Sequence, residues 1–423
     1  MWRNAEFRAL VASHAFSVAG DDLARIALAI VFFERTGSPL VAALTFSLSY
    51  LPSLLAGPLL STFGDRFERR RVMVVCDVAR AALITAAACS VLLDWPIVTA
   101  FTLVLTAAFF SPAFDASRAA LIPQVVSNDQ YVAASVVTGL TYQLTQIGSY
   151  LAGAVAVSAV GGGGALLIDA GTFVLSAVAL IVFVERRPHA EHIHGAGRGM
   201  VAMMRTAVGE VWARPVLRSL LLVSSVTVAG AAVPEGLAIV YASRHGLHGL
   251  AQGAMVAALP IGAALGGILL ARYVARDKRI RWIRPCAWLA PVPLVLTAVP
   301  LPPAAVFALW TCAGLLLAFH FAANAAFMLY TPQDLRARAM GLAQSLLTAA
   351  QVLGLIGGGL LAAVFDVRYV VGIAGAITAA GIALPLLRWP TELRNGGTEV
   401  AVPFRRLGDV DVPDHSASRV IDA

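Results

Sequence analysis

Three charged residues lie close together inside a long apolar stretch near the start of the chain. Asp21, Asp22 and Arg25 fall within residues 8–33. In a helix, residues three or four apart share a face, so either acid can pair with Arg25. Burial and a positive neighbour act on a carboxylate in opposite directions, so such a group can alternate between a proton and a cation. The set therefore predicts proton coupling, with a permanent structural ion pair as the alternative.

A fourth acid, Glu235, follows Pro234 in a second long apolar stretch. Glu235 lies 209 residues after Ile26, the neighbour of Arg25, and the chain repeats itself at this offset. We expect Glu235 and the first three residues to line the outer part of a central cavity. The alternative is an acid at a helix end in contact with water.

Further polar residues are expected at membrane depth. The candidates for contact with a substrate are Tyr142, Gln143, Gln146, His320, Asn324, Gln344 and Gln351. Asparagine and glutamine also join helices to one another inside membranes, at about 1 kcal/mol per hydrogen bond. For any single residue of this set, joining helices is the simpler interpretation.

Two more acids lie in apolar stretches. Asp77 is one helical turn from Arg80, and this pair is assigned a structural role. Asp169 is expected near the outer end of its helix, in contact with water.

The composition requires lipid as the solvent for most of the chain. Hydrophobic residues make up 59% of the 423 residues, charged residues only 13%, and the mean hydropathy is +0.80. Soluble domains carry about 25% charged residues and cannot bury so much apolar surface. The net charge of +7 does not indicate a nucleic-acid partner, because the basic residues lie in short loops between apolar stretches, as in cytoplasmic loops of membrane proteins.

A helix needs roughly 20 apolar residues to cross a bilayer. On that basis the sequence predicts twelve transmembrane helices, at 8–33, 39–63, 72–93, 96–117, 131–158, 164–184, 215–243, 248–272, 283–300, 303–330, 337–363 and 367–388. Arginine and lysine gather between spans two and three, between six and seven, and between eight and nine. The opposite loops hold only Arg35, Arg244 and Arg368. Both termini are therefore predicted in the cytoplasm of a bacterial cell, with the chain in the inner membrane.

Four segments are expected. Residues 1–184 form a first six-helix bundle, 185–214 a cytoplasmic linker, 215–388 a second six-helix bundle and 389–423 a loose cytoplasmic tail. The linker contains a candidate interfacial helix at 198–213 and the histidines His189, His192 and His194. Three histidines in a polar linker seldom bind metal, so we expect no metal site.

The two bundles repeat one another in sequence. Residues 122–124 (IPQ) match 331–333 (TPQ), and 28–32 (LAIVF) match 237–241 (LAIVY), both at the offset of 209. The repeats are parallel, since each begins in the cytoplasm after an even number of spans. Two parallel repeats related by an axis along the membrane normal suit a substrate path at their interface. The fold expected is an all-α membrane protein of two pseudo-symmetric six-helix bundles.

The loop between spans two and three carries a motif. Residues 61–71 read STFGDRFERRR. This resembles the Gly-x-x-x-Asp-Arg-x-Gly-Arg-Arg signature of the major facilitator superfamily, with Asp65, Arg66, Arg69 and Arg70 matching and Ser61 and Glu68 replacing two glycines. Within that superfamily the sequences TGSP at 36–39, DVAR at 77–80 and SPAF at 111–114 resemble the bacterial drug-efflux branch that includes macrolide and siderophore exporters.

The resemblance implies a cytoplasmic gate. In the superfamily this loop helps hold the cytoplasmic side closed when the transporter faces outward. The partners expected for the motif are Asp115 and Arg118 and the start of span eleven near residues 335–338. The alternative is that the arginines serve topology alone.

Taken together, these features of the sequence predict a secondary active transporter. We expect a proton-coupled exporter of small amphiphilic compounds or drugs, working as a monomer by alternating access, with no cofactor. The alternatives are an importer or lipid flippase of the same superfamily and, from another class, a membrane-embedded enzyme or sensor. No phosphate-binding loop and no hydrolase motif is present in the sequence, so neither ATP drive nor an enzyme is predicted.

Overall fold

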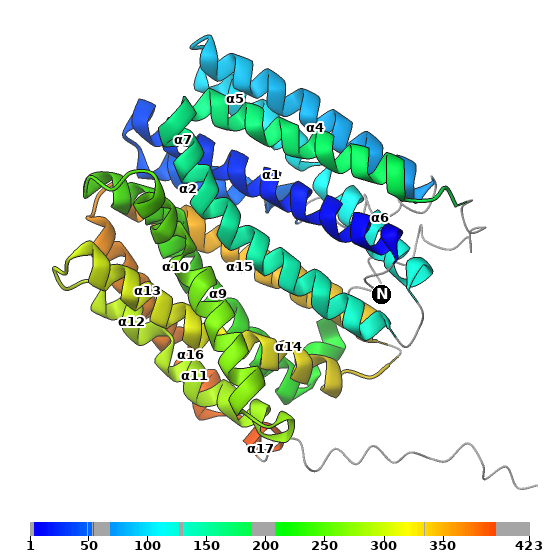
Figure 1. Ribbon diagram of the computed structural model, residues 1–423. Helices are drawn as coiled ribbons and strands as arrows, with labels where there is room; N and C mark the ends of the chain where they lie inside the picture. Colours follow the sequence, from blue (N-terminus) through cyan, green and yellow to red (C-terminus); the bar gives the residue numbers. More distant parts are fainter. Residues whose placement is uncertain are drawn as a thin grey trace, which may run out of the picture.

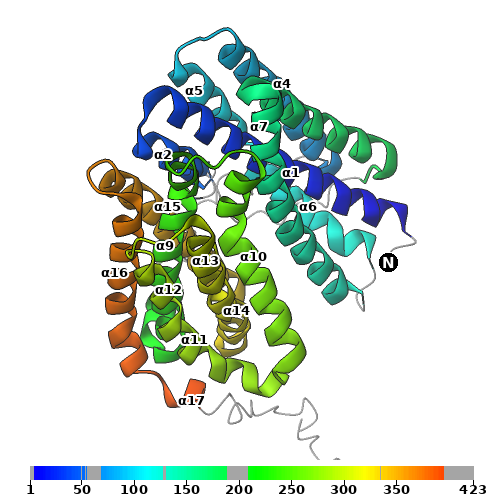
Figure 2. The same cartoon turned by 60° about the vertical axis from the view of Figure 1, so that its left-hand side comes forward.

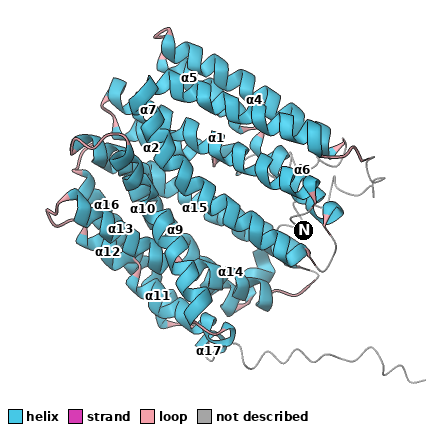
Figure 3. Ribbon diagram, in the orientation of Figure 1, coloured by secondary structure: helices cyan, strands magenta, loops and turns pink. Residues whose placement is uncertain are grey.

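The computed structural model describes residues 4–48, 50–52, 54, 68–126, 130–187, 208–333 and 335–394. Throughout these ranges the chain forms helices joined by short loops, and no strand occurs in them (Figure 3). The all-α prediction is confirmed. The linker histidines, most of the predicted interfacial helix and the chain beyond residue 394 lie outside the described residues.

The helices fall into two successive sets. The first half contains α1 (Ala5–Thr36), α2 (Pro39–Leu48), α4 (Arg69–Leu92), α5 (Ile97–Ala108), α6 (Ser111–Val125) and α7 (Tyr131–Phe183). The second half contains α9 (Pro215–Arg244), α10 (Leu250–Tyr273), the 3-10 helix η1 (Arg276–Trp282), α11 (Ile283–Leu289), α12 (Pro291–Leu296), α13 (Pro303–Leu317), α14 (Phe319–Tyr330), α15 (Arg336–Ala362), α16 (Val367–Leu387) and α17 (Thr391–Arg394). The starts of α1 and α9 are 210 residues apart and those of α6 and α14 are 208 apart, close to the offset of the sequence repeat.

Eight described helices are long and apolar enough to cross a membrane, where the sequence predicted twelve. Helix α1 is not among the eight because Asp21, Asp22 and Arg25 lie in its middle. Helix α2 is described over ten residues only. The predicted ninth span is interrupted at Pro291, which has no N–H for a helical hydrogen bond, so α11 and α12 are short.

The fifth and sixth predicted spans form one assigned helix, α7, with a sharp kink. Gly161 has φ 73° and ψ 172°, a conformation that is essentially restricted to glycine. The kink reverses the chain without a loop and divides the helix into a first limb (residues 131–160) and a second limb (residues 162–183). Both limbs pack against α1. A single glycine therefore replaces the turn that the sequence predicted between two spans.

Figures 1 and 2 show the two halves as separate groups of helices. Helices α1, α4, α5 and α6 lie together on one side, and α9 and α11–α16 lie on the other. Helix α10 runs beside α7, and α15 packs against α2. The largest contacts between the halves are thus those of α7 with α10 and of α2 with α15, and α9 adds contacts with α1 and α2.

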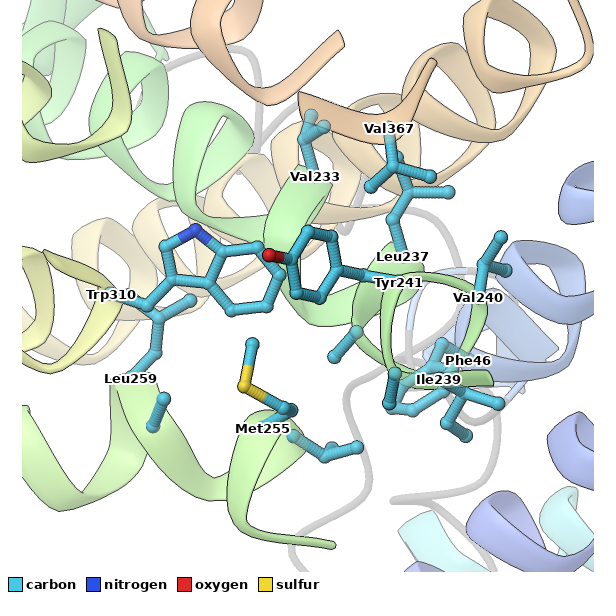
Figure 4. Packing of buried hydrophobic residues seen from close by; sticks show 14 of the residues in the cluster. Phe46, Val233, Leu237, Ile239, Val240, Tyr241, Met255, Leu259, Trp310 and Val367 are labelled. Carbon is cyan, nitrogen blue, oxygen red and sulfur yellow. The ribbon is translucent and has the colours of Figure 1, made fainter. Parts of the chain in front are cut away.

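One hydrophobic cluster joins the two halves. It includes Ile26 and Ile30 of α1 and Phe46 of α2, together with Leu237 of α9 and Leu355 of α15. Figure 4 shows its centre, where Trp310 and Tyr241 pack beside Met255, with Phe46 of the first half close to Ile239. All these residues lie toward the same end of the molecule, which holds the loops at 37–38, 245–249 and 363–366. We call it the closed end.

At the opposite end each hydrophobic cluster belongs to one half. One contains Leu10, Met73, Phe114 and Leu180 of the first half. Another contains Val216, Phe319, Phe327, Ile382 and Leu393 of the second half. The described cores are therefore shared between the halves at the closed end and separate at the other.

The backbones come very close at the closed end. A Cβ atom on Gly253 of α10 would lie 2.6 Å from the carbonyl oxygen of Tyr150 on α7. A Cβ atom on Gly359 of α15 would lie 2.8 Å from Cβ of Ala43 on α2. Small residues at such crossings let helices approach closely, as is common within membranes. The halves are in contact here without room for a further methyl group.

Candidate functional site

Asp22 and Arg25 form a buried ion pair on α1. Asp22 Oδ1 and Arg25 Nη1 are 3.0 Å apart, and the two residues are 3% and 7% exposed. The guanidinium also lies over the rings of Tyr50, 5.3 Å from the centroid, and Phe46, at 6.0 Å. A carboxylate and aromatic faces together provide the surroundings that a buried guanidinium needs. The spacing of three residues, read from the sequence, places this pair on one helical face.

Tyr150 of α7 connects this pair to the second half. Its hydroxyl accepts hydrogen bonds from Arg25 Nη1 at 3.1 Å and from Gln146 Nε2 at 3.3 Å. It donates its proton to Glu235 Oε1 on α9 at 3.2 Å. The other oxygen of Glu235 accepts from Gln351 Nε2 on α15 at 3.3 Å. We call the six residues Asp22, Arg25, Gln146, Tyr150, Glu235 and Gln351 the inter-half network.

The network combines two carboxyl groups with one guanidinium. Glu235 is partly buried, close to where the sequence repeat placed it relative to α1. If both Asp22 and Glu235 are ionised, the three charged groups carry a net charge of minus one in an apolar region. An uncompensated charge there costs several kcal/mol. A proton or a bound cation removes this imbalance, so the arrangement can take up either.

Tyr150 was not among the residues predicted from the sequence, although its spacing indicates a polar face. Tyr142, Gln146 and Tyr150 follow one another every four residues, so they form a polar stripe on one face of α7. Tyr150 is fully buried, and its ring belongs to the hydrophobic cluster of the closed end. A tyrosine inside an apolar stretch is usually assigned to packing, but its hydroxyl needs a partner when it is buried. The partner of this hydroxyl, Glu235, lies on another helix, α9, so the sequence around Tyr150 does not show it.

Asp21 does not share Arg25 with Asp22, as one reading of the sequence allowed. Its Oδ2 lies 2.5 Å from Nη2 of Arg80 on α4. The same guanidinium donates to Ser17 Oγ at 2.7 Å and to Ser111 Oγ at 2.6 Å. Consecutive residues of a helix point about 100° apart, since a turn takes 3.6 residues. Asp21 therefore faces α4 and α6, while Asp22 faces the inter-half network.

Arg80 is the centre of a second polar cluster, within the first half. It is 1% exposed, and its guanidinium lies 4.4 Å from the ring centroid of Phe173. Asp77, one turn away, is 3.7 Å from Nη1 and accepts a hydrogen bond of 2.5 Å from Ser176. These contacts hold α4 against α1 and α7, as the structural assignment of Asp77 and Arg80 expects.

Asp169 is not in contact with water, contrary to the expectation from its place in the sequence. It is 0% exposed, in the second limb of α7. A hydropathy pattern locates a residue along a helix but not around it, and the second limb presents Asp169 to α1 rather than outward.

The predicted gate residues separate into two groups. Asp65 and Arg66 lie outside the described residues. Arg70 donates to the carbonyl oxygens of Leu180 and Ile181, at 3.1 and 2.6 Å, in the last turn of α7. Arg69 donates to the carbonyl oxygen of Ala120 on α6 at 2.8 Å. Both arginines thus bind carbonyl groups near helix C-termini, where a positive charge is favourable.

Asp115 and Arg118 face α1 rather than the arginines of the motif that are described. Asp115 Oδ1 lies 3.6 Å from Arg118 and 3.9 Å from Nδ1 of His14. The His14 ring stacks on Tyr142 with centroids 6.2 Å apart. Asp115 is exposed, so a carboxylate and the ring of Tyr142 lie open next to one another.

The remaining polar candidates are dispersed. Gln143 Nε2 donates to the carbonyl oxygen of Pro260 on α10 at 3.4 Å, which is a second contact between the halves. His320 lies 2.9 Å from the hydroxyl of Thr227, within the second half. Asn324 and Gln344 are exposed. Of the seven candidates, Gln146 and Gln351 belong to the inter-half network.

Comparison with known proteins identifies relatives across most of the chain. The sequence model described as Major Facilitator Superfamily matches residues 10–329. The multidrug efflux pump Tap of Mycolicibacterium fortuitum is 26% identical over 374 residues, which cover 81% of this chain and 86% of that protein. Macrolide efflux protein A of Streptococcus pyogenes is 26% identical over 168 residues, 35% of this chain and 40% of that protein. The match thus spans about two fifths of the macrolide efflux protein.

Solved structures show the same fold. The nucleoside transporter NupG superposes with a TM-score of 0.71 at 14% identity, covering 91% of this chain and all of that one. A bacterial homologue of the lysosomal transporter Spinster, in an inward-facing and unoccupied conformation, superposes with a TM-score of 0.63 at 14% identity, covering 91% and 94% of the two chains. At these identities the likeness concerns the fold alone.

Proposed function

Because the chain belongs to the Major Facilitator Superfamily, whose members carry small molecules across membranes, we propose that it is a proton-coupled exporter of small amphiphilic compounds. In this proposal the two halves are the units that rock against each other, and the substrate passes between them. Protons moving inward drive the substrate outward.

The inter-half network is the observation that carries the proposal. It joins an acid of the first half, Asp22, to an acid of the second, Glu235, through Arg25 and Tyr150. One guanidinium and two ionised carboxyl groups leave one negative charge at the site. Either a proton or a cationic group of the substrate neutralises this charge, so binding of one disfavours binding of the other. Competition between them at one site is the basis of antiport.

The contact pattern supports an inward-facing conformation. If both termini lie in the cytoplasm, as the positive loops predict, the closed end faces the outside of the membrane. The halves share a hydrophobic core at that end and have separate cores at the other. A site open to the cytoplasm is the state in which an exporter takes up its substrate.

Two observations support small amphiphilic substrates. The two efflux relatives are named for macrolide and for multidrug transport. Around Arg25 the surroundings are aromatic and aliphatic with few charges, which suits ligands held mainly by apolar contact. We also propose a monomer in the bacterial inner membrane as the working unit, because one chain supplies both halves of the substrate path.

Transport into inverted membrane vesicles tests the proposal. An acidic lumen should drive accumulation of a fluorescent amphiphilic dye, and a protonophore should abolish it. Asp22→Asn should reduce the accumulation by an order of magnitude, because the site then lacks one exchangeable proton. Asp94→Asn is the matched control, since Asp94 pairs with Arg35 in an exposed loop and should leave transport unchanged. The proposal is wrong if accumulation does not depend on the gradient, or if Asp22→Asn transports like the parent. Accumulation driven by the opposite gradient would indicate an importer.

A further inference from the structure

Asp169 is a buried acid that forms no ion pair within the described residues. It is 0% exposed, and the neighbouring hydroxyl of Thr172 donates to the Asp169 backbone carbonyl at 2.8 Å, so the carboxyl oxygens have no well-formed hydrogen bond of their own. A carboxylate that is ionised and buried without hydrogen bonds costs several kcal/mol in a protein. A neutral carboxylic acid avoids most of that cost, and this acid occupies a position the inter-half network does not use.

The carboxyl group lies against the backbone of α1 at Gly20. A Cβ atom at residue 20 would come within 2.5 Å of Asp169 Oδ1, 2.7 Å of Thr172 Oγ1 and 2.8 Å of Phe173 Cζ. Only glycine leaves space for the carboxyl group at this point. The next residue of α1 is Asp21, so the buried acid lies beside the Asp21–Arg80 ion pair.

The charged groups that face Asp169 come from two helices. From α1 they are Asp21 and Asp22. From α4 it is the guanidinium of Arg80, which also pairs with Asp77. Three carboxyl groups, on Asp21, Asp77 and Asp169, thus lie in the neighbourhood of one guanidinium inside the first half, and the first two pair with it. Asp77 and Asp169 are both 0% exposed. If all three acids are ionised, the cluster carries two uncompensated negative charges away from water.

Asp21 is the member of this cluster that reaches the surface. Its side chain is 33% exposed, while that of Arg80 is 1% exposed. Arg80 already binds Asp21, Ser17 and Ser111, and its Nε is buried without a partner. The guanidinium of Arg80 thus binds Asp21 through Nη2, and its Nε–H is available to a further acceptor.

We propose that Asp169 is a proton-binding site: a neutral carboxylic acid within the first half, loaded and unloaded through Asp21. When the site unloads, the O–H bond of Asp169 breaks and the proton passes to the carboxylate of Asp21. The ion pair of Arg80 moves from Asp21 to Asp169, so the net charge of the cluster is unchanged by this transfer. Asp21 then releases the proton to water, and the negative charge added by this step lies on Asp21, the member that reaches the surface. The site has no member in the second half and therefore does not share its ligands with the inter-half network.

The inference adds to the proposed function a second proton site outside the substrate path. Its role in transport rests on proton coupling, but proton binding by Asp169 does not. A chain that proves not to be driven by protons would still contain the neutral acid. The test therefore reads the acid directly, without substrate or gradient.

Infrared spectroscopy of the purified protein in lipid nanodiscs tests the site. At neutral pH the parent should show the carbonyl band of a protonated carboxylic acid, and Asp169→Asn should lose that band. Asp94→Asn, which replaces an exposed acid in a loop, should keep the Asp169 band. Glu235→Gln should keep it too, because a carbonyl band from the inter-half network would be a separate band. The proposal is overturned if Asp169→Asn retains the full band.

Thermal unfolding provides a second measurement. Asn and Ser are both neutral, so Asp169→Asn and Asp169→Ser should unfold within a few degrees of the parent. If Asp169 is instead ionised, both variants remove one of the two uncompensated negative charges of the cluster and unfold well above the parent. An unfolding temperature far from that of the parent in both variants would therefore also contradict the proposal.

Discussion

The hydroxyl of Tyr150 on α7 lies 3.2 Å from Glu235 Oε1 on α9 and 3.1 Å from Arg25 Nη1 on α1. One phenol thus receives a hydrogen bond from a cation of the first half and gives one to an acid of the second. If the halves separate at the closed end, the bond from Tyr150 to Glu235 must break, while the bond from Arg25 to Tyr150 stays within the first half. The state of the site is therefore connected to the position of the halves by a single side chain.

Tyr150→Phe should weaken this connection. The substitution keeps the ring in its hydrophobic cluster but leaves Glu235 and Arg25 each short of one partner. We expect a loss of stability of about 1–3 kcal/mol, the usual effect of an unsatisfied buried polar group, and markedly slower dye transport. Unfolding in detergent and vesicle transport measure the two effects. Tyr50→Phe keeps the aromatic face over Arg25 and should behave like the parent; equal loss in both variants would argue against a special role for Tyr150.

Asp22 and Arg25 should show strong energetic coupling. Arg25→Gln leaves the Asp22 carboxylate buried without its nearest cation, and breaking such a pair costs about 3–5 kcal/mol. Asp22→Asn should cost less, because Arg25 keeps its hydrogen bond to Tyr150, which also binds Glu235. The double variant removes both charges, so its destabilisation should be smaller than the sum of the two by more than about 1 kcal/mol. Unfolding of the four proteins in one detergent completes the cycle. Additive effects would show that the pair is not a unit.

A disulfide across the closed end should lock the halves together. A Cβ atom on Gly249, at the start of α10, would lie 3.8 Å from Cβ of Ser158 on α7, and a disulfide needs Cβ atoms about 3.8 Å apart. Ser158→Cys with Gly249→Cys, in a chain whose exposed Cys89 and Cys312 are replaced by alanine, should cross-link under oxidation and stop transport.

Reduction should restore transport of the paired variant. Gly249 has φ 55° and ψ −126°, which L residues rarely adopt, so cysteine there is strained by about 1–3 kcal/mol. The single variants carry this strain without a cross-link and serve as controls. Full transport by the oxidised, cross-linked protein would mean that the closed end does not open during the cycle.

Arg70→Ala should destabilise the end of α7. Its guanidinium binds the carbonyl oxygens of Leu180, which also accepts from Val184 N–H, and of Ile181, in the last turn, where helix carbonyl groups commonly lack intrahelical partners. We expect a loss of about 1 kcal/mol, from the lost hydrogen bonds and the lost charge at a helix C-terminus. Thermal unfolding measures it, with Arg71→Ala as the control, because Arg71 is the exposed neighbour in the same motif. Equal unfolding temperatures for all three proteins would contradict a capping role.

Much of the fold was predictable because it depends on local chemistry. Long apolar stretches must form helices in lipid, since no water is available to the backbone groups there. Where the structure differs from the prediction, single residues are responsible. Gly161 turns two expected spans into a kinked α7, and Pro291 divides another into α11 and α12. Neither residue changes the hydropathy on which the prediction rested.

The sequence alone determined the helical class, the repeat and the acids and arginines that lie in apolar surroundings. It also showed that Arg25 can pair with Asp21 or Asp22, because residues three or four apart meet on a helix whatever surrounds it, but it did not choose between them. Only the tertiary structure decided that Asp21 binds Arg80, that Tyr150 joins Arg25 to Glu235, and that Asp169 is sealed against Gly20. The physical reason is that these partners lie on different helices. Their meeting depends on how each helix is rotated about its axis, and a change of one residue in packing register turns a side chain by about 100°.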